Sequence, residues 1–380
     1  MSVFLLSCGG TGGHLSPGIA LAESLMERGH SVTLLISQKK VDSRLIGKYP
    51  HLRFLRIPGT GFGWDPVTLL RCAISQAKGF YACLKLVREL RPGCVLGFGG
   101  FTSAPVALAA RIFGVPVALH EANRVPGRAV RILGHIARRI YLPTGVILPA
   151  VSIMSIRHAG LPVRREIAPV PAAAARRSLG LDPEGKVLVV LGGSQGASAL
   201  NHWVRRELDA LFAAGMQVVC VTGLGKDAEE IIERRTPSGR MAKAVFTPFC
   251  DRMGELISAA DLVVSRSGAG TLAELVRCHV PAILVPFPHS ADDHQRANAA
   301  SFADQGGGRV VEQSFLASLR AEVCELMADD EMLARLRANL RLIDESSTLD
   351  LMLADLEKIA SGRRDDDETP DEKDSAPMES

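Results

Sequence analysis

The hydrophobic positions of this chain fall into short apolar runs, separated by longer stretches in which apolar residues recur at helical spacing. Short apolar runs are typical of strands buried on both faces, and their alternation with amphipathic stretches favours parallel α/β sheets. The pattern predicts strands at 3–7, 31–36, 95–97, 117–120, 186–191, 217–222, 262–265 and 282–286. It predicts helices at 17–28, 105–113, 197–213 and from Thr271, with helical pattern continuing to about residue 360.

The alternation starts afresh near the middle of the chain, after a segment rich in proline and alanine at 161–185. A length of 380 residues also favours two domains over one. We therefore expect two Rossmann-like, doubly wound domains with a cleft between them. The predicted N-terminal domain spans residues 1–163, and the predicted C-terminal domain spans 164–343. A C-terminal helix at 344–361 is expected to pack back on the first domain, and an acidic disordered tail is expected at 362–380.

Composition indicates a globular body, with 47% apolar and 22% charged residues. The eight cysteines form no CxxC pair, so neither a zinc site nor a disulfide framework is predicted, and reduced cysteines in a cytosolic protein are expected. The N-terminus lacks the basic start and long apolar core of a signal peptide. No apolar stretch reaches the roughly 18 residues of a spanning helix.

Charge is distributed unevenly, because residues 1–163 hold 19 basic and 6 acidic side chains, a net of +13. Such a basic half implies an anionic partner: a membrane surface, a phosphorylated lipid or nucleic acid. Nucleic acid is the weakest of the three, since aromatic and basic residues do not interleave as in base-stacking surfaces. Segment 67–90, apolar with interspersed Arg and Lys, is predicted to be an interfacial helix; an ordinary domain helix is the alternative.

A glycine-rich turn follows the first strand of each half: GGTGGH at 9–14 and GGSQG at 192–196. Such turns let backbone N–H groups approach a phosphate or a sugar hydroxyl. The first turn is not a dinucleotide fingerprint, because Leu15 stands where a third glycine is needed and no acidic residue closes the next strand near 37–40. A nicotinamide or flavin enzyme is therefore disfavoured.

His14 ends the first turn, just before the predicted helix, which has Ser16 as its N-cap and Pro17 as its first residue. The positive end of the helix dipole would tend to keep the imidazole neutral. A neutral histidine beside a glycine-lined cavity is a candidate general base, and a structural histidine that caps the loop is the alternative.

Two later stretches carry candidate ligand contacts. In SRSGAGTLAE (265–274), small residues before a helix N-terminus favour a diphosphate, and Glu274 could accept hydrogen bonds from both ribose hydroxyls or could simply stabilise the helix dipole. Downstream, Gln295 and Asn298 would share one helix face, and their amides suit sugar hydroxyls. The nearby His and Asp residues at 289–294 match no metal-ligand spacing, so no metal site is predicted.

Taken together, these motifs occur in a characteristic order: GGTGGH, GFGGFTSAP (97–105), HEAN (120–123) with PG at 126–127, GGSQG, SRSGAGTLAE and HQxxNA (294–299). The chain closely resembles the bacterial MurG family, the UDP-N-acetylglucosamine transferases that convert lipid I to lipid II in peptidoglycan synthesis. The resemblance covers roughly residues 3–355. It implies a GT-B fold in which the C-terminal domain mainly holds UDP-GlcNAc and the N-terminal domain mainly holds the acceptor.

The resemblance also assigns site residues. His14, Glu121 and Asn123 fall at active-site positions, and either His14 or Glu121 would be the base. The loop that meets the donor and acceptor phosphates contains Thr11, Gly12 and Gly13. Donor contacts are implied for Ser194, Arg266, Glu274 (ribose), Gln295 and Asn298 (sugar), the backbone at Cys250 (uracil) and the interdomain Arg164. Arg266 and the helix N-terminus at Gly268–Thr271 would stabilise the leaving diphosphate, so no metal or other cofactor is expected.

Three positions depart from the family pattern: Phe101 replaces a tyrosine, Leu161 an asparagine in GNPVR, and Val130 an asparagine after the PG. These changes concern the acceptor geometry more than the donor class.

The predicted function is inverting transfer of GlcNAc from UDP-GlcNAc to the 4-hydroxyl of MurNAc in lipid I, at the cytoplasmic face of the plasma (inner) membrane. The expected partners are UDP-GlcNAc, lipid I and an anionic membrane surface, with cell-wall or division proteins as candidates and no nucleic acid. Alternatives are a UDP-sugar transferase to another lipid such as diacylglycerol, a UDP-GlcNAc 2-epimerase, and a non-catalytic cell-wall scaffold. An epimerase would not explain the basic, apolar N-terminal half, and a scaffold would not need His14, Glu121, Arg266 and Glu274.

Overall fold

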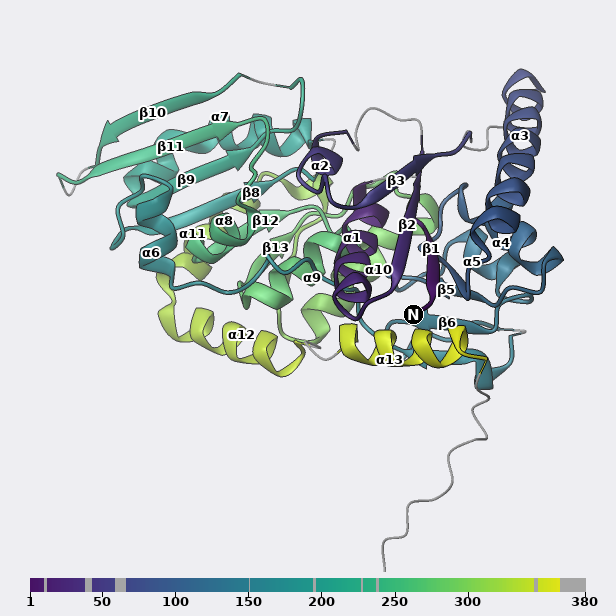
Figure 1. The fold of residues 1–380 in the computed structure, drawn as a ribbon. Helices are drawn as coiled ribbons and strands as arrows, with labels where there is room; N and C mark the ends of the chain where they lie inside the picture. The colour runs from purple at the N-terminus through teal and green to yellow at the C-terminus, as the bar shows by residue number, and fades with distance from the viewer. Residues whose placement is uncertain are drawn as a thin grey trace, which may run out of the picture.

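The computed structural model describes residues 1–9, 12–37, 43–58, 66–149, 151–193, 196–226, 228–236, 239–344 and 348–362. It forms two α/β lobes, each built on a seven-stranded sheet (Figure 1). The N-lobe has strand order β3-β2-β1-β4-β5-β6-β7, with every neighbouring pair parallel. Its strands are β1 (Val3–Ser7), β2 (Ser31–Ile36), β3 (Arg53–Arg56), β4 (Cys94–Gly97), β5 (Val117–His120), β6 (Arg139–Leu142) and β7 (Ile156–His158).

The C-lobe has strand order β10-β11-β9-β8-β12-β13-β14, and only the edge strand β10 runs antiparallel to its neighbour. Its strands are β8 (Lys186–Leu191), β9 (Met216–Val221), β10 (Glu230–Arg235), β11 (Met241–Thr247), β12 (Leu262–Ser265), β13 (Ala282–Leu284) and β14 (Gly308–Val310). The predicted strands of both halves are present, because each is a run of apolar residues buried on both faces.

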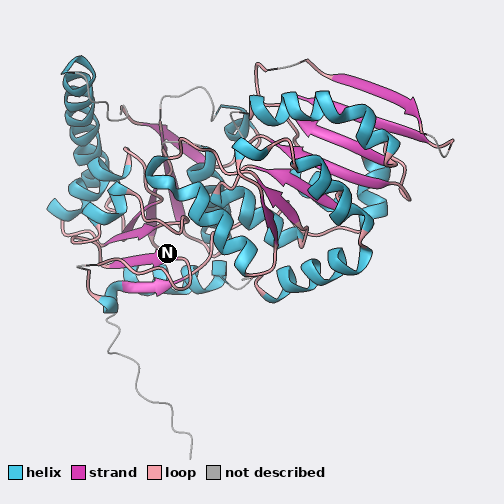
Figure 2. Cartoon of the chain, turned by 180° about the vertical axis from the view of Figure 1, so that it is seen from behind, coloured by secondary structure: helices cyan, strands magenta, loops and turns pink. Residues whose placement is uncertain are grey.

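Helices cover both faces of the sheets, as the view from behind shows (Figure 2). In the N-lobe they are α1 (Gly12–Glu27), α2 (Ser43–Gly47), α3 (Pro66–Leu90), α4 (Ser103–Ile112) and α5 (Arg128–Leu133). The C-lobe contains α6 (Ala172–Ser178), α7 (Ser198–Ala213), α8 (Met253–Ala259), α9 (Ala269–Cys278), α10 (His294–Asp304), α11 (Leu319–Ala328) and α12 (Asp330–Leu342). The last helix is α13 (Thr348–Ala360).

Two helix starts differ from the prediction. Helix α1 begins at Gly12, so Ser16 does not cap it and Pro17 lies inside it, because the second glycine pair of the turn already winds into the helix. Helix α9 begins at Ala269, after Gly268 with its extended backbone (φ −68°, ψ 137°), and not at Thr271. His14 therefore lies in the first turn of α1, and Thr271 lies in the first turn of α9.

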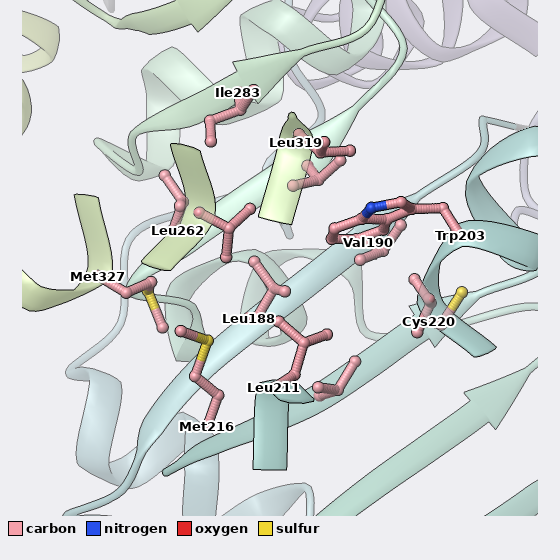
Figure 3. Packing of buried hydrophobic residues seen from close by; sticks show 14 of the residues in the cluster. Leu188, Val190, Trp203, Leu211, Met216, Cys220, Leu262, Ile283, Leu319 and Met327 are labelled. Carbon is pink, nitrogen blue, oxygen red and sulfur yellow. The ribbon is translucent and has the colours of Figure 1, made fainter. Parts of the chain in front are cut away.

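The C-lobe core fills the space between one sheet face and the helices above it (Figure 3). Leu188 and Val190 of β8 pack with Trp203 of α7 and Leu319 of α11, and all four side chains are at most 1% exposed. This apolar layer fixes the central strands, so that the loops at their carboxyl ends are held in place around the cleft.

Helix α13 follows the C-lobe in sequence but lies along the N-lobe (Figure 1). Its buried face, which includes Met352, Leu353 and Leu356, belongs to the same apolar cluster as Phe4 of β1. Asp355 accepts hydrogen bonds from Arg139 (2.7 and 2.9 Å) and from the Tyr141 hydroxyl (2.7 Å). The chain thus crosses between the lobes twice, through 159–171 and again through the segment between α12 and α13.

Replacing Leu356 by alanine should lower the free energy of unfolding by about 2–5 kcal/mol, because the side chain is fully buried and its removal leaves a cavity. Thermal unfolding followed by circular dichroism measures the effect. Leu351→Ala is the matched control, since Leu351 lies on the same helix and is 61% exposed; it should change stability by no more than about 0.5 kcal/mol. Equal losses in both variants would show that α13 does not depend on this packing.

Candidate active site in the interdomain cleft

The carboxyl ends of the parallel strands of both lobes border one cleft, where α1 of the N-lobe contacts α9 of the C-lobe. Asn298 of α10 spans the two lobes. Its side-chain NH₂ donates to Asn123 Oδ1 (3.0 Å), and its Oδ1 accepts from the backbone N–H of Arg124 (2.9 Å). Two residues that the sequence analysis assigned to the site from different halves of the chain are therefore in direct contact.

His14 lies in the first turn of α1, and its buried Nδ1 has no hydrogen-bond partner among the residues that the structure describes. The loop after β4 approaches the ring closely: a Cβ on Gly100 would lie 3.4 Å from Nδ1 and only 2.4 Å from the carbonyl oxygen of Gly9. Gly99 and Gly100 also have positive φ angles of 88° and 72°, which favour glycine. The glycines of GFGG are thus needed for the loop to cover the imidazole.

Burial lowers the pKa of His14 below its ordinary value of 6.5, and the negative charge of Glu121 partly opposes this shift. The lowered pKa agrees with the neutral imidazole that the sequence analysis expects, but its main cause is burial of the ring and not the helix dipole. A neutral imidazole can accept a proton, so His14 has the protonation state that a general base needs.

Glu121 directly follows β5, is buried, and uses both carboxylate oxygens inside its own loop. One oxygen accepts from the backbone N–H (2.9 Å) and the side-chain NH₂ (2.8 Å) of Asn123, and the other accepts from the Gly127 N–H (2.7 Å). These three bonds close the turn between β5 and α5. The geometry therefore suits Glu121 to orienting Asn123 and to supporting His14 electrostatically.

Glu274 faces Arg164, which lies in the first segment that crosses between the lobes. Glu274 Oε1 is 3.6 Å from the Arg164 guanidinium, and the Arg164 side chain is only 9% exposed. Burial raises the pKa of Glu274, and the positive charge of Arg164 opposes that rise. The Glu274 side chain is 16% exposed, and the cation beside it favours the ionised form that accepts hydrogen bonds.

Arg266 and Gln295 both hold the loop after β13. Arg266 donates to the carbonyl oxygens of Val285 (3.0 Å) and Pro286 (3.2 Å), and Gln295 Oε1 accepts from the Phe287 N–H (2.9 Å). The structure thus places both side chains as supports of this loop. For these side chains to contact a donor, at least some of their hydrogen bonds to the loop would have to be replaced by hydrogen bonds to the donor.

The other described positions lie at helix starts or in the loop before α8. Gly12 begins α1 with Gly13 next to it, Gly268 precedes α9, and Cys250 lines a cavity of about 640 Å³ beside β11. Thr11 and Ser194 fall outside the described residues, as does 363–380, most of the predicted tail. Val130, at a position that departs from the family pattern, is buried in the N-lobe core.

Several contacts that join the lobes were not found from the sequence. Lys48 pairs with Asp251 (2.9 Å), Arg131 with Asp292 (3.1 Å), and Arg165 with Glu27. None of these residues lies in a recognisable motif, and each pair joins positions more than 100 residues apart. Periodicity and spacing carry no information about such pairs.

Within the described ranges, no three His, Cys, Asp or Glu side chains gather as ligands for a metal ion. None of the helices in those ranges is both long enough and apolar enough to cross a bilayer.

The glycosyltransferase family 28 N-terminal domain matches residues 4–142, and the glycosyltransferase family 28 C-terminal domain matches residues 187–348. The UDP-N-acetylglucosamine–N-acetylmuramyl-(pentapeptide) pyrophosphoryl-undecaprenol N-acetylglucosamine transferase of Opitutus terrae is 60% identical over 94% of this chain and 95% of its own. The transferase of the same name from Parasynechococcus marenigrum is 39% identical over 82% of this chain and 84% of its own.

Solved structures of glycosyltransferases have the same fold as this chain. MurG of Acinetobacter baumannii superposes with a TM-score of 0.70 at 25% identity, covering 94% of this chain and 99% of that one. The calicheamicin glycosyltransferase CalG4 superposes with a TM-score of 0.67 at 16% identity, covering 95% of this chain and 98% of that one. At this low identity the likeness supports the fold and not the function. The predicted GT-B fold is confirmed. The chain belongs to the MurG family of glycosyltransferases, with both family 28 domains present.

Proposed function

We propose that this protein transfers GlcNAc from UDP-GlcNAc to the 4-hydroxyl of MurNAc in lipid I, giving lipid II and UDP. The observation that carries the proposal is the contact of α1 with α9, because it brings the helix of His14 against the helix of Glu274. Residues 1–163 would form the acceptor domain and 164–343 the donor domain. The relatives that carry this activity in their names span nearly the whole chain.

In the proposed mechanism, His14 removes the proton from the acceptor hydroxyl while that oxygen attacks the anomeric carbon. Attack opposite the departing UDP inverts the configuration and gives a β-linkage. Glu121 orients Asn123 through the hydrogen bonds that close their turn. Its negative charge stabilises the imidazolium that forms on His14. The helix N-terminus at Gly268 would stabilise the leaving diphosphate, so that the chemistry proceeds without a metal ion.

Donor recognition would be divided along the cleft. Glu274 accepts hydrogen bonds from the ribose hydroxyls, and the backbone at Cys250 meets uracil in the cavity beside β11. Asn298 and Gln295 bind the sugar by exchanging the contacts they make here with Asn123 and Phe287. Arg266, Ser194 and the loop of Thr11, Gly12 and Gly13 contribute contacts to the diphosphate.

The acceptor lipid would lie beside α3, which projects from the N-lobe (Figure 1). Leu70 and Ile74 are 63% and 48% exposed on this helix, and the basic side chains interspersed among its apolar residues are exposed as well. Exposed aliphatic groups among cations suit an anionic membrane surface. We propose peripheral attachment at the cytoplasmic face of the plasma membrane, where cell-wall or division proteins are candidate partners.

Replacing Leu70 and Ile74 together by serine should reduce flotation with anionic vesicles by about tenfold or more, since inserting each aliphatic side chain contributes roughly 1.5–3 kcal/mol. The vesicles contain phosphatidylglycerol, and bound protein is measured after centrifugation. Ile231→Ser is the control, because Ile231 is 62% exposed on β10 of the opposite lobe and its loss should leave flotation unchanged. Equal flotation of all three proteins would exclude α3 as the membrane contact.

The transfer itself is tested with labelled UDP-GlcNAc, lipid I and, in a parallel reaction, diacylglycerol. Labelled lipid II with untouched diacylglycerol is the expected result. UDP release without lipid II would favour another acceptor or an epimerase, and no donor turnover would favour a scaffold.

A further inference from the structure

Four polar side chains form a continuous chain from the N-lobe core to the donor side of the cleft. The Tyr49 hydroxyl donates to Glu166 Oε1 (2.5 Å), and one terminal nitrogen of Arg164 donates to the same oxygen (2.8 Å). The other terminal nitrogen of Arg164 faces Glu274 Oε1 at 3.6 Å. The chain therefore links both lobes through the first crossing segment.

The members of this chain differ in how deeply they are buried. Tyr49 lies two residues after the end of α2 and is 6% exposed within the apolar cluster of the N-lobe, so its ring is fixed. Arg164 is also buried, whereas the side chain of Glu166 is 39% exposed. A half-exposed glutamate has several accessible rotamers. The hydrogen bond from Tyr49 selects the rotamer that also binds Arg164.

Fixing one nitrogen of a guanidinium fixes the other, because the group is planar and rigid. The bond from Arg164 to Glu166 thus sets the position of the nitrogen that faces Glu274. Tyr49 belongs to the N-lobe and Glu274 to the C-lobe, so separation of the lobes would break the chain at Tyr49. The orientation of Glu274 then depends on the closed cleft.

We propose that Tyr49 and Glu166 are positioning residues for donor recognition, which orient Arg164 so that Glu274 presents its carboxylate to the two ribose hydroxyls. The inference rests on the proposed function, since it assumes that Glu274 binds the ribose. It adds a coupling between closure of the cleft and the strength of ribose recognition, carried by residues that do not touch the donor.

The test compares inhibition by UDP and by 2′-deoxyUDP, which lacks one ribose hydroxyl. The wild-type enzyme should prefer UDP by about tenfold or more, as expected for a hydrogen bond to a charged group. Tyr49→Phe and Glu166→Gln should each reduce this preference by about three- to tenfold and raise KM for UDP-GlcNAc more than they lower kcat. The double variant should lose less preference than the sum of the two single losses, because Tyr49, Glu166 and Arg164 form one hydrogen-bonded cluster in which Arg164 also donates to the Tyr49 hydroxyl (3.4 Å).

Tyr141→Phe is the matched control. It also removes a tyrosine hydroxyl bound to a carboxylate, that of Asp355 (2.7 Å), but at the α13 contact. It should lower the unfolding temperature and leave the preference for UDP at the wild-type value. An unchanged preference in both Tyr49→Phe and Glu166→Gln would overturn the inference and leave the proposed function intact. Absence of any preference in the wild-type enzyme would overturn the ribose role of Glu274, and this inference with it.

Discussion

Replacing His14 by glutamine is expected to lower kcat by about 10²–10⁴-fold, the usual contribution of a general base, with little change in KM for UDP-GlcNAc. Glutamine keeps much of the size and polarity of the side chain but cannot accept the proton. Steady-state rates with lipid I as acceptor measure the effect, and unchanged turnover would rule out His14 as the base.

The pH dependence provides a second readout of the same prediction. Neutral imidazole is the active form, and burial lowers the pKa of His14. The rate should therefore hold as the pH falls past the ordinary histidine value of 6.5 and decline only below it, as the imidazole becomes protonated. His14→Gln should lack this decline.

Glu121→Gln separates the two candidate bases. It should also lower the rate, because an amide cannot accept all three hydrogen bonds that close the 121–127 turn. The acid decline should persist in this variant and move to lower pH, because the negative charge that raises the pKa of His14 is gone. Loss of the decline in Glu121→Gln, with its retention in His14→Gln, would reverse the assignment.

Replacing Glu274 by alanine should raise KM for UDP-GlcNAc by about 10–150-fold, corresponding to roughly 1.5–3 kcal/mol for hydrogen bonds to a charged group. The loss also leaves Arg164, which is 9% exposed, without one of its two carboxylate partners. Initial rates over a range of donor concentrations measure the change.

Glu325→Ala is the control for this variant, because Glu325 is an exposed carboxylate that is paired with Arg309 at the surface of the C-lobe. It should leave KM unchanged. A Glu274→Ala enzyme with wild-type KM would show that Glu274 serves only the helix dipole, the alternative left open by its position in the sequence.

The central strands were predictable because each is a run of apolar residues buried on both faces, such as 186–191. The start of α1 was not predictable, because Ser16 and Pro17 have the residue types of an N-cap and a first helical residue. The helix in fact begins four residues before Ser16. Strands β3, β6, β7, β11 and β14 were missed, and so was β10. Its sequence, EIIERR, has no alternation of buried and exposed positions, and only pairing with β11 makes it a strand.

The candidate site divides in a similar way. Glu274, Asn123 and Arg164 lie in local motifs, and the order of those motifs identified the family. Tyr49 and Glu166 lie in no motif, and their contact depends on how the N-lobe meets the segment that crosses to the C-lobe. The hydrogen bonds that occupy Glu121 could not be predicted either, because they require the conformation of the turn that they close.

The central claim is a single displacement in the cleft between the lobes, with His14 as base and no metal ion. The most direct measurement is the anomeric configuration of the new linkage, determined by NMR on lipid II formed from UDP-GlcNAc and lipid I in the presence of a metal chelator. The account predicts a β-linked product formed at the rate seen without chelator. An α-linked product, or loss of the reaction on chelation, would contradict it.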